Sequence, residues 1–352
     1  MTASRIEAFA VTGVGEIRPG DDLGATLVAA LADAGTPLLD RDVLVVSSKV
    51  VSKAEDRLVA GDSRAKAVEA ETARIVAERM TPRGVARIVE SRSGPVLAAA
   101  GVDSSNVELG TLLLLPADPD GSARLLRRQI SRLTGRRVGV LVSDTAGRPW
   151  RDGQVDLAIG AAGVQVVDDL RGALDPHGQP LEVTVRALAD ELASLADLVK
   201  GKLAGTPAAV IRGLGTWVID GDGPGAAALL RPARDDWFRF GHVEAVRAAL
   251  GVPPGTDGVP AVDVAPSTVG QRLQRAVAVA LVTASSASVE VGLEGDGGRF
   301  AVAGGSPGEL VALGALVQRV VTAGWAEDLE IDVSPLELAP SPSVSIRARS
   351  RS

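Results

Sequence analysis

The stretch LVSDTAGRPWRDG, residues 141–153, passes directly from an apolar run into a dense group of polar side chains. Asp144 and Thr145 follow the apolar residues, and Arg148 and Arg151 flank a stiff proline–tryptophan pair. Ligands of α/β proteins bind at the carboxyl ends of strands, and carboxylate and hydroxyl oxygens suit hard cations. The stretch therefore predicts a binding site at the end of a strand, with a surface salt-bridge pattern as the alternative.

Lysines and hydroxyl groups gather in a second stretch, SSKVVSKAEDR, which also follows an apolar run. Ser48, Lys49 and Lys53 could bind phosphate, because ammonium and hydroxyl groups donate hydrogen bonds to phosphate oxygens. Lysines four residues apart are also typical of a solvated helix face. Both interpretations are open on these residues alone.

Acidic and amide side chains occur in two further stretches that follow apolar runs. AAAGVDSSNVELG contains Asp103 and Asn106, and LLLLPADPDGSA contains Asp118 and Asp120. Asp and Asn are usual helix-capping and turn residues, so a cap or a rigid loop is the structural interpretation of each stretch. The functional interpretation is that their oxygen atoms bind a divalent cation.

The composition leaves few other routes to catalysis. The chain has no Cys, no Tyr and two His, so thiolate nucleophiles, sulfur-bound zinc and a Ser-His-Asp triad have little support. Oxygen ligands beside lysines suit Mg²⁺ or Mn²⁺ bridging the phosphates of a nucleotide. Neither GxxxxGK followed by Ser or Thr, nor GxGxxG after a predicted strand, is present, so a P-loop or Rossmann site is not supported.

The charge and hydropathy of the chain argue against two classes of partner. A net charge of −7 and a pI of about 5.1 disfavour a broad nucleic-acid surface. The apolar segments are far shorter than the roughly 18 residues that a membrane helix needs, so no membrane span is expected. The amino terminus lacks the features of a secretory signal, and a cytoplasmic location is the expectation.

The elements that must position these residues alternate along the first part of the chain, as in an α/β fold. Apolar runs bounded by turn residues predict strands over 42–50, 136–144 and 206–213. Apolar residues at helical spacing predict helices over 64–80, 121–133 and 183–203. The polar stretches fall next to the ends of these elements.

A change in composition divides the chain after a helix that ends near Leu250. We predict a first domain over residues 1–250, a Pro/Gly-rich linker over 251–266 and a small C-terminal α/β unit of unknown role over 267–352. Within the C-terminal unit the patterns predict a helix, a hairpin, a helix, a strand and a frayed tail, over residues 267–283, 288–305, 308–324, 329–334 and 339–352.

The order of these motifs along the chain matches a known protein family. Over residues 8–245 the sequence resembles the coenzyme F420:L-glutamate ligase family, with the motifs VVSSKVVSKAEDR, AGVDSSNV, LLPADPDGSA, SDTAGRPWRDGQVDLAIGAAG, LRGALDPHGQPL, ADELASLADLVKGK and VIRG. So many motifs in one order are not expected by chance. The resemblance implies a two-part α/β fold particular to the family, in an intertwined homodimer.

The resemblance also implies an activity. Such an enzyme joins L-glutamate to the lactyl carboxylate of coenzyme F420-0 and then adds further glutamates through γ-linkages. GTP would phosphorylate the carboxylate to an acyl phosphate, with two Mg²⁺ or Mn²⁺ ions neutralising phosphate charge and K⁺ as an additional candidate cation. The amine of glutamate would then displace the phosphate, leaving GDP as the spent nucleotide.

The family's functional residues are placed only where this sequence matches its motifs. The implied metal ligands are Asp103, Asp144 and Thr145. The implied nucleotide contacts are Val14, Gly15, Glu16, Ile17, Ser48, Lys53 and Asn106. Arg148 and Arg151 are expected to face the anionic substrate or the transferred phosphoryl group.

Two parts of the implied site are undefined or altered. The general base is not identified, and Glu108, Asp118 and Asp120 are the candidates. His177 stands where a tyrosine is expected in relatives, so any substrate contact at that position is altered.

The sequence departs from actinobacterial relatives beyond the first domain. Those relatives often carry a second, nitroreductase-like FMN domain that reduces dehydro-F420-0, whereas residues 251–352 are too few for such a domain and match none of its motifs. No FMN is therefore expected. Two other functions stay open: a nucleotide- and metal-binding regulator without turnover, and an amide- or phosphate-transferring enzyme that acts on another acid.

Overall fold

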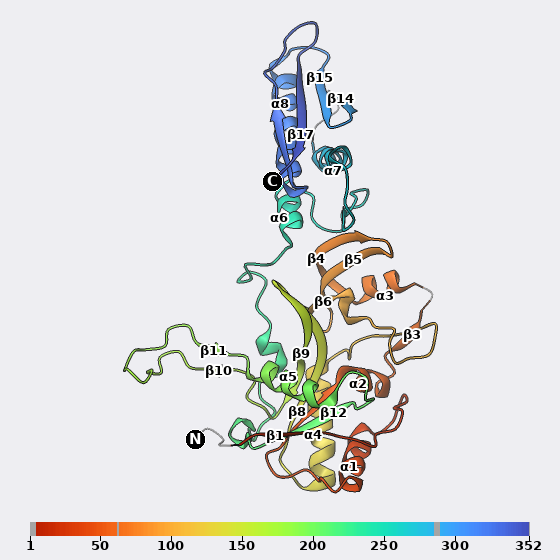
Figure 1. Cartoon of the computed structure of the whole chain (residues 1–352), viewed down its shortest axis with the longest axis vertical. Helices are drawn as coiled ribbons and strands as arrows, with labels where there is room; N and C mark the ends of the chain where they lie inside the picture. Colours follow the sequence, from red (N-terminus) through yellow and green to blue (C-terminus); the bar gives the residue numbers. More distant parts are fainter. Residues whose placement is uncertain (1–4, 62, 285–288, 352) are drawn as a thin grey trace. The chain divides into compact units, whose positions relative to one another are not determined.

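The computed structural model describes residues 5–61, 63–284 and 289–351. Its contacts divide the chain into two compact units (Figure 1). Unit 1 comprises Met1–Ala73 and Glu90–Asp235. Unit 2 comprises Arg74–Val89 and Asp236–Ser352. Both units combine helices with sheets, which confirms the expected α/β class. Within the described ranges, no helix combines the length and apolar character that crossing a membrane requires.

A five-stranded mixed sheet forms the centre of unit 1 (Figure 1). Its strands lie in the order β1 (Glu7–Ala10), β12 (Ala208–Arg212), β2 (Val43–Ser47), β8 (Gly139–Arg148) and β9 (Arg151–Ala162). β2 and β8 run parallel, whereas the other neighbouring strands run antiparallel. β2 and β12 confirm the strands predicted within residues 42–50 and 206–213.

Helices cover both faces of this sheet. One face is covered by α1 (Leu23–Asp33), α2 (Ser48–Ala54) and α4 (Pro119–Thr134). The other face is covered by α5 (Leu188–Lys200). Along β2, Leu44 packs with the α1 and α4 side and Val45 packs with the α5 side. Both are fully buried, which explains why β2 reads as a continuous apolar run rather than an alternation.

β8 and β9 form a hairpin that is longer than the sequence patterns predict. The expected strand 136–144 ends at Asp144, but β8 continues to Arg148 because β9 continues to pair with it. The parallel pairing of β2 with β8 ends earlier, at Ser47 and Ser143. Asp144 is therefore the first residue of β8 beyond the parallel pair, although it does not end its own strand.

Shorter elements complete unit 1. β3 pairs with β7, and β10 pairs with β11. The bounds are β3 Leu58–Ala60, β6 Val96–Ala98, β7 Thr111–Leu113, β10 Asp168–Asp169, β11 Val185–Arg186, α3 Arg64–Glu71, and the 3-10 turns η1 Ala99–Gly101, η2 Gly215–Trp217 and η3 Ala226–Leu229. The helix predicted over 183–203 is shorter, since β11 takes up its first residues.

The predicted helix over 64–80 is wrong in its second half. α3 ends at Glu71, and Thr72–Thr81 forms β4, which neighbours β5 (Gly84–Ser91) in a sheet. β4 contains β-branched residues that favour strands, such as the Ile-Val pair in its centre. Pairing with β5 therefore outweighs the weak helical spacing of its apolar residues.

Unit 2 contains an antiparallel four-stranded sheet packed against two helices (Figure 1). The strand order is β14-β15-β17-β16, with bounds Val289–Glu294, Gly297–Val302, Ser343–Ser350 and Leu329–Val333. Unit 2 also contains the helices α6 (His242–Ala249), α7 (Val269–Val282) and α8 (Pro307–Ala326) and the short strand β13 (Val262–Asp263). The fully buried Phe300 belongs to the core between α7, α8 and the sheet. The predicted hairpin and both predicted helices are confirmed.

The predicted frayed tail over 339–352 is wrong. β17 lies between β15 and β16 and pairs with both. Val344 and Ile346 point into the core, whereas Ser345 and Arg347 are exposed. This alternation is a strand pattern, and the polar, arginine-rich composition of the segment conceals it.

The compact units group the chain differently from the predicted domains. The second segment of unit 2 begins at Asp236, so unit 2 includes α6, which the sequence patterns place within residues 1–250. Contacts of β4 account for the grouping. β13 pairs with β4, and Glu244 of α6 accepts a 2.9 Å hydrogen bond from the backbone N–H of Glu78 and a 2.6 Å hydrogen bond from Arg79. The domain assignment itself stays a prediction.

Candidate functional site

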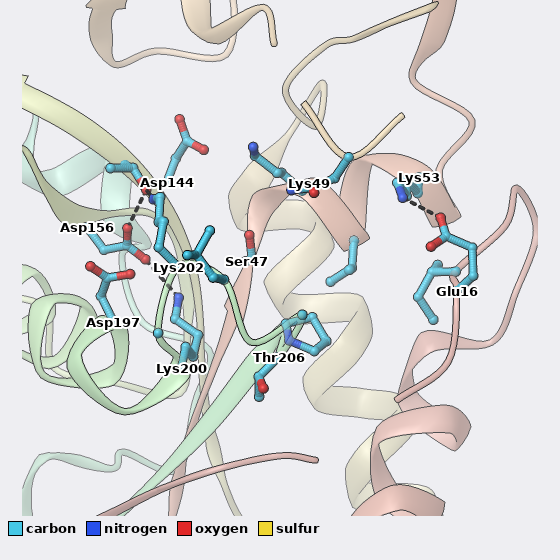
Figure 2. A pocket seen from close by; sticks show the side chains of 18 of the residues that line it. Glu16, Ser47, Lys49, Lys53, Asp144, Asp156, Asp197, Lys200, Lys202 and Thr206 are labelled. Atoms are coloured by element: carbon cyan, nitrogen blue, oxygen red, sulfur yellow. Dashed lines mark hydrogen bonds and ion pairs between the residues drawn. The ribbon is translucent and has the colours of Figure 1, made fainter. Parts of the chain in front are cut away.

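A cavity of about 360 Å³ lies in unit 1 beside the point where the parallel pairing of β2 with β8 ends (Figure 2). Most of its lining comes from the loop before α1, the β2–α2 junction, the middle of β8 and the loop after α5. Figure 2 shows Lys53 and Glu16 on one side and Asp156, Asp197 and Lys200 on the other. Charged side chains of both signs therefore surround this cavity.

Ser48 and Asp144 meet because the parallel pairing of β2 with β8 ends at Ser47 and Ser143, and each of the two residues comes directly after that pair. The buried hydroxyl of Ser48, the first residue of α2, donates a 2.6 Å hydrogen bond to Oδ1 of Asp144. Burial raises the pKa of Asp144 to about 6; the charges of Asp156 and Asp103 add to this effect, and Ser48 and Lys49 oppose it. A cation beside Asp144 would favour its ionised form.

Asp103 is held by Lys49 and by its own turn. Nζ of Lys49 forms an ion pair with Asp103 and a hydrogen bond to the hydroxyl of Ser105. The carboxylate also accepts hydrogen bonds from the backbone N–H groups of Ser104 (2.7 Å) and Ser105 (3.0 Å). Burial disfavours the charge of Asp103, but the hydrogen bonds from Lys49 and Ser105 outweigh it and lower its pKa to about 2. Because Lys49 lines the cavity, an ammonium group links Asp103 to it.

A buried polar network surrounds Asp156 of β9. Oδ2 accepts hydrogen bonds from Nζ of Lys200 (2.8 Å) and from the hydroxyl of Ser143 (2.9 Å), and Oδ1 accepts from the hydroxyl of Thr145 (2.7 Å). Lys202 in turn donates to the Thr145 hydroxyl. Burial disfavours the charge of Asp156, but Lys200 and the two hydroxyls hold its pKa below the ordinary value. Asp156 is thus an ionised carboxylate at the cavity wall.

The structure brings most of the predicted nucleotide contacts to this cavity. The lining includes Gly15, Glu16, Ile17, Lys53 and Asn106. Lys53 forms an ion pair with Glu16 across the two lining segments. Ser48 lies next to the lining through its bond to Asp144, whereas Val14 packs against the core of unit 1. Binding of a nucleotide by these residues stays a prediction.

Arg148, Arg151 and His177 are not among the residues that line the cavity. The two arginines flank the turn of the β8–β9 hairpin, where Trp150 has a positive φ of 59°. Arg151 is exposed, whereas Nη1 of Arg148 is buried without a hydrogen-bond partner among the described residues. His177 is exposed in the loop between β10 and β11. The predicted substrate contacts of the arginines would need the hairpin turn to face a ligand that extends beyond this cavity.

The three candidate bases also lie outside the cavity lining. Asp118 caps the N-terminus of α4, and Asp120 accepts backbone hydrogen bonds from Ala161 (2.8 Å) and Ala226 (2.7 Å). Glu108 is exposed in the loop before β7. The contacts of the two aspartates fit the structural interpretation of LLLLPADPDGSA, a rigid loop that begins a helix.

Four charged residues of the lining are not singled out by the sequence motifs: Asp156, Asp197, Lys200 and Lys202. At the sequence level, the two lysines are typical of a helix C-terminus, where cations interact favourably with the helix dipole. The useful signal was Asp156, a lone acid within the apolar part of QVDLAIGAAG. A carboxylate inside a buried strand requires a charged or hydrogen-bonding partner.

The oxygen donors of this region fit a hard cation in type but are not gathered into a cage. Across residues 5–61, 63–284 and 289–351, no group of three or more Asp, Glu or His side chains is close enough to hold a metal ion. Two of the predicted ligands nevertheless contact an ammonium group, Asp103 with Lys49 and Thr145 with Lys202. These oxygens already interact with positive charge, so the donor chemistry suits Mg²⁺ or Mn²⁺.

Comparisons with known proteins match the part of the chain that forms the cavity. A model of the family described as F420-0:Gamma-glutamyl ligase matches residues 13–213. The coenzyme F420:L-glutamate ligase of Methanothermobacter thermautotrophicus is 39% identical over 253 aligned residues, covering 66% of this chain and 99% of the relative. Proteins with the same name from Methanopyrus kandleri and Archaeoglobus fulgidus are 44% and 43% identical, covering 64% and 60% of this chain and 94% and 88% of the relatives. The resemblance predicted from the motifs is confirmed.

Proposed function

The chain belongs to the F420-0:gamma-glutamyl ligase family, and we propose that it joins L-glutamate to the lactyl carboxylate of coenzyme F420-0 and adds further γ-linked glutamates. The observation that carries this proposal is the cavity beside the end of the parallel pairing of β2 with β8. It lies within the matched residues, and its lining combines four lysines with carboxylates: Lys49, Lys53, Lys200 and Lys202 with Glu16, Asp144, Asp156 and Asp197.

GTP is the proposed source of energy for the amide bond. A carboxylate is a poor electrophile, and transfer of the γ-phosphoryl group to one of its oxygens gives an acyl phosphate and GDP. The glutamate amine then attacks the carbonyl carbon, inorganic phosphate leaves, and a carboxylate of the cavity or water takes the amine proton. The lysines of the lining supply the positive charge that the phosphates need during this transfer.

Divalent metal is the second proposed requirement. Asp103, Asp144 and Thr145 would hold Mg²⁺ or Mn²⁺, which when bound neutralises phosphate charge. The raised pKa of Asp144 supports this role, because a carboxyl group with a pKa of about 6 gains from a nearby cation. Lys49 and Lys202 contact Asp103 and Thr145. In the proposed complex, the metal would take over these oxygens and the two ammonium groups would contact the phosphates of the nucleotide.

One experiment tests the proposed reaction directly. The purified full chain is incubated with coenzyme F420-0, L-glutamate, GTP and Mn²⁺, and the products are identified by mass. We expect successive additions of glutamate that require both GTP and Mn²⁺. Nucleotide binding without any product would point to a regulator, and product formation only with a different acid would point to a related amide ligase. Either result would contradict the proposal. A homodimer is the proposed assembly, and light scattering measures it.

A further inference from the structure

Asp156 joins three polar side chains at the wall of the cavity. It lies on β9 directly opposite Thr145 of β8, whose hydroxyl donates to its Oδ1. Its Oδ2 contacts Lys200, the last residue of α5 (Figure 2). The side chains of Asp156 and Lys200 are 4% and 5% exposed, so the pair is almost completely buried. Asp156, Thr145 and Lys200 nevertheless all line the cavity. A single carboxylate thus contacts two groups that a ligand of this cavity would meet.

We propose that Asp156 is a positioning residue that fixes the direction of the Thr145 hydroxyl and holds the Lys200 ammonium group at the cavity wall. The resulting pair of groups is suited to a phosphate-bound divalent cation, with the Thr145 oxygen toward the cation and Lys200 toward a phosphate oxygen. This inference rests on the proposed function in one respect: it takes the ligand to be a metal–nucleotide complex.

The direction of the Thr145 hydroxyl follows from its single proton. The hydroxyl donates that proton to Oδ1 of Asp156 over 2.7 Å, so the lone pairs of its oxygen point away from Asp156. Lys202 donates to this same oxygen in the structure, which shows that a cation can reach the lone pairs. Without the carboxylate, the hydroxyl could rotate and present its proton to the cation.

The position of the Lys200 ammonium group depends on the same carboxylate. Nζ of Lys200 donates to Oδ2 of Asp156 over 2.8 Å and to the hydroxyl of Ser143 over 3.1 Å. Asp156 and Ser143 therefore fix the Lys200 ammonium group at the cavity wall, where low hydration makes its attraction for a phosphate strong.

A purely structural role is the alternative explanation for this network. Buried ion pairs are often no more stabilising than apolar residues of similar volume, so stability alone gives little reason for one at this wall. The two explanations differ in what happens to ligand binding in variants that still fold. A purely structural role predicts that these variants bind the metal–nucleotide complex with unchanged affinity. A positioning role predicts weaker affinity, and it predicts that substitutions of Asp156 and Thr145 have non-additive effects on the binding free energy.

The test measures binding of Mn²⁺ with a non-hydrolysable GTP analogue to the full chain by titration calorimetry. Substituting Asp156→Asn should weaken binding by about 10-fold or more, the usual effect of losing a residue that orients a metal ligand. Thr145→Val should also weaken it, and the double variant should be little worse than the weaker single variant. Asp42→Asn is the matched control. Asp42 is an equally buried carboxylate of unit 1 that pairs with Arg212 over 2.8 Å, but it does not line the cavity.

A second variant keeps the inference testable if Asp156→Asn does not fold. The double substitution Asp156→Leu with Lys200→Met removes both charges and leaves no unpaired ion, so it should fold and still bind the complex about 10-fold or more weakly. Unchanged affinity in either folded variant overturns the inference. Absence of binding by the unsubstituted chain overturns both the inference and the proposed function. Normal binding without glutamate addition contradicts only the proposed reaction, and the variants still decide the role of Asp156.

Discussion

The hydroxyl of Ser48 donates a 2.6 Å hydrogen bond to Oδ1 of Asp144, although 96 positions of sequence separate the two residues. The parallel strands β2 and β8 bring them together, because each residue directly follows the last parallel pair, Ser47 with Ser143. A predicted nucleotide contact and a predicted metal ligand are therefore direct neighbours. We expect a change at either residue to affect the binding of both ligands.

Replacement of Asp144 is the most direct test of the metal assignment. Asp144→Asn keeps the size of the side chain and an oxygen acceptor for Ser48 but removes the negative charge that would offset a cation. We expect Mn²⁺ affinity to fall, and glutamate addition to fall by roughly 10²-fold or more if about 3 kcal/mol of transition-state stabilisation is lost. Mn²⁺ binding and product mass measure the two effects.

Two further substitutions serve as a parallel and a control for Asp144→Asn. Asp103→Asn should have a similar effect, because it removes the second predicted carboxylate ligand. Asp152→Asn should be milder, since Asp152 is exposed in the hairpin and lies outside the predicted ligand set. Near-normal Mn²⁺ affinity and turnover in Asp144→Asn would falsify the metal assignment.

The stability of the chelator-treated protein should depend on pH through Asp144. Its pKa is raised by burial from 3.8 to about 6, so in this interval the folded chain binds more protons than the unfolded chain. Stability from this group is therefore lost as pH rises from about 4 to about 6. Asp144→Asn should remove that loss. The melting temperature of the variant should therefore exceed that of the unsubstituted protein by more at about pH 7.5 than at about pH 4. An equal gain at both pH values would contradict the buried, proton-binding state of Asp144.

Deletion of residues 255–352 should leave glutamate addition by folded protein largely intact, because the cavity belongs to unit 1. The deletion should nevertheless lower solubility. It removes Glu327, which binds Arg247 of α6 over 2.8 Å, and it uncovers the apolar side of that helix. Product formation per folded molecule and light scattering measure the two effects. A deletion protein that is folded and dimeric but inactive would show that unit 2 contributes to the reaction.

The purified protein is expected to be colourless and unable to reduce dehydro-F420-0 with added FMN. The described residues of 251–284 and 289–351 include α7, α8 and a four-stranded sheet, and the sequence of residues 251–352 carries no motif of a nitroreductase-like domain. An absorption spectrum checks the first expectation and a reduction assay the second. A flavin spectrum in stoichiometric amount would overturn the prediction.

The parts of this fold that the sequence predicted are those whose patterns are local. The VLVV run of β2 is fully buried on both faces, and such a run identifies a strand without knowledge of its neighbours. β17 failed this test because its buried residues alternate with arginines and serines that resemble a disordered tail. The helix predicted over 64–80 failed because its second half is decided by pairing with β5.

The same division applies to the cavity. Residue type and strand position were enough to select Asp144, Thr145 and Lys53 as candidates. The partnership of Asp156 with Lys200 joins positions 44 residues apart and depends on how α5 packs across the sheet. No local pattern encodes that distance. Only the lone acid in an apolar strand signalled that a partner was needed.

Unit 2 is assembled from two separate lengths of chain, and this gives the molecule an unusual response to cleavage. Arg74–Val89 is covalently joined to unit 1 at both ends, yet it pairs with β13, and Glu78 accepts a 3.0 Å hydrogen bond from the backbone N–H of Gly255. A protease cut between Asp235 and Asp236 would therefore break the chain into two covalent fragments, but the contacts within unit 2 would keep the fragments associated. The nicked protein should run as two bands in denaturing gels and as one species in native chromatography, much as a two-chain complex does.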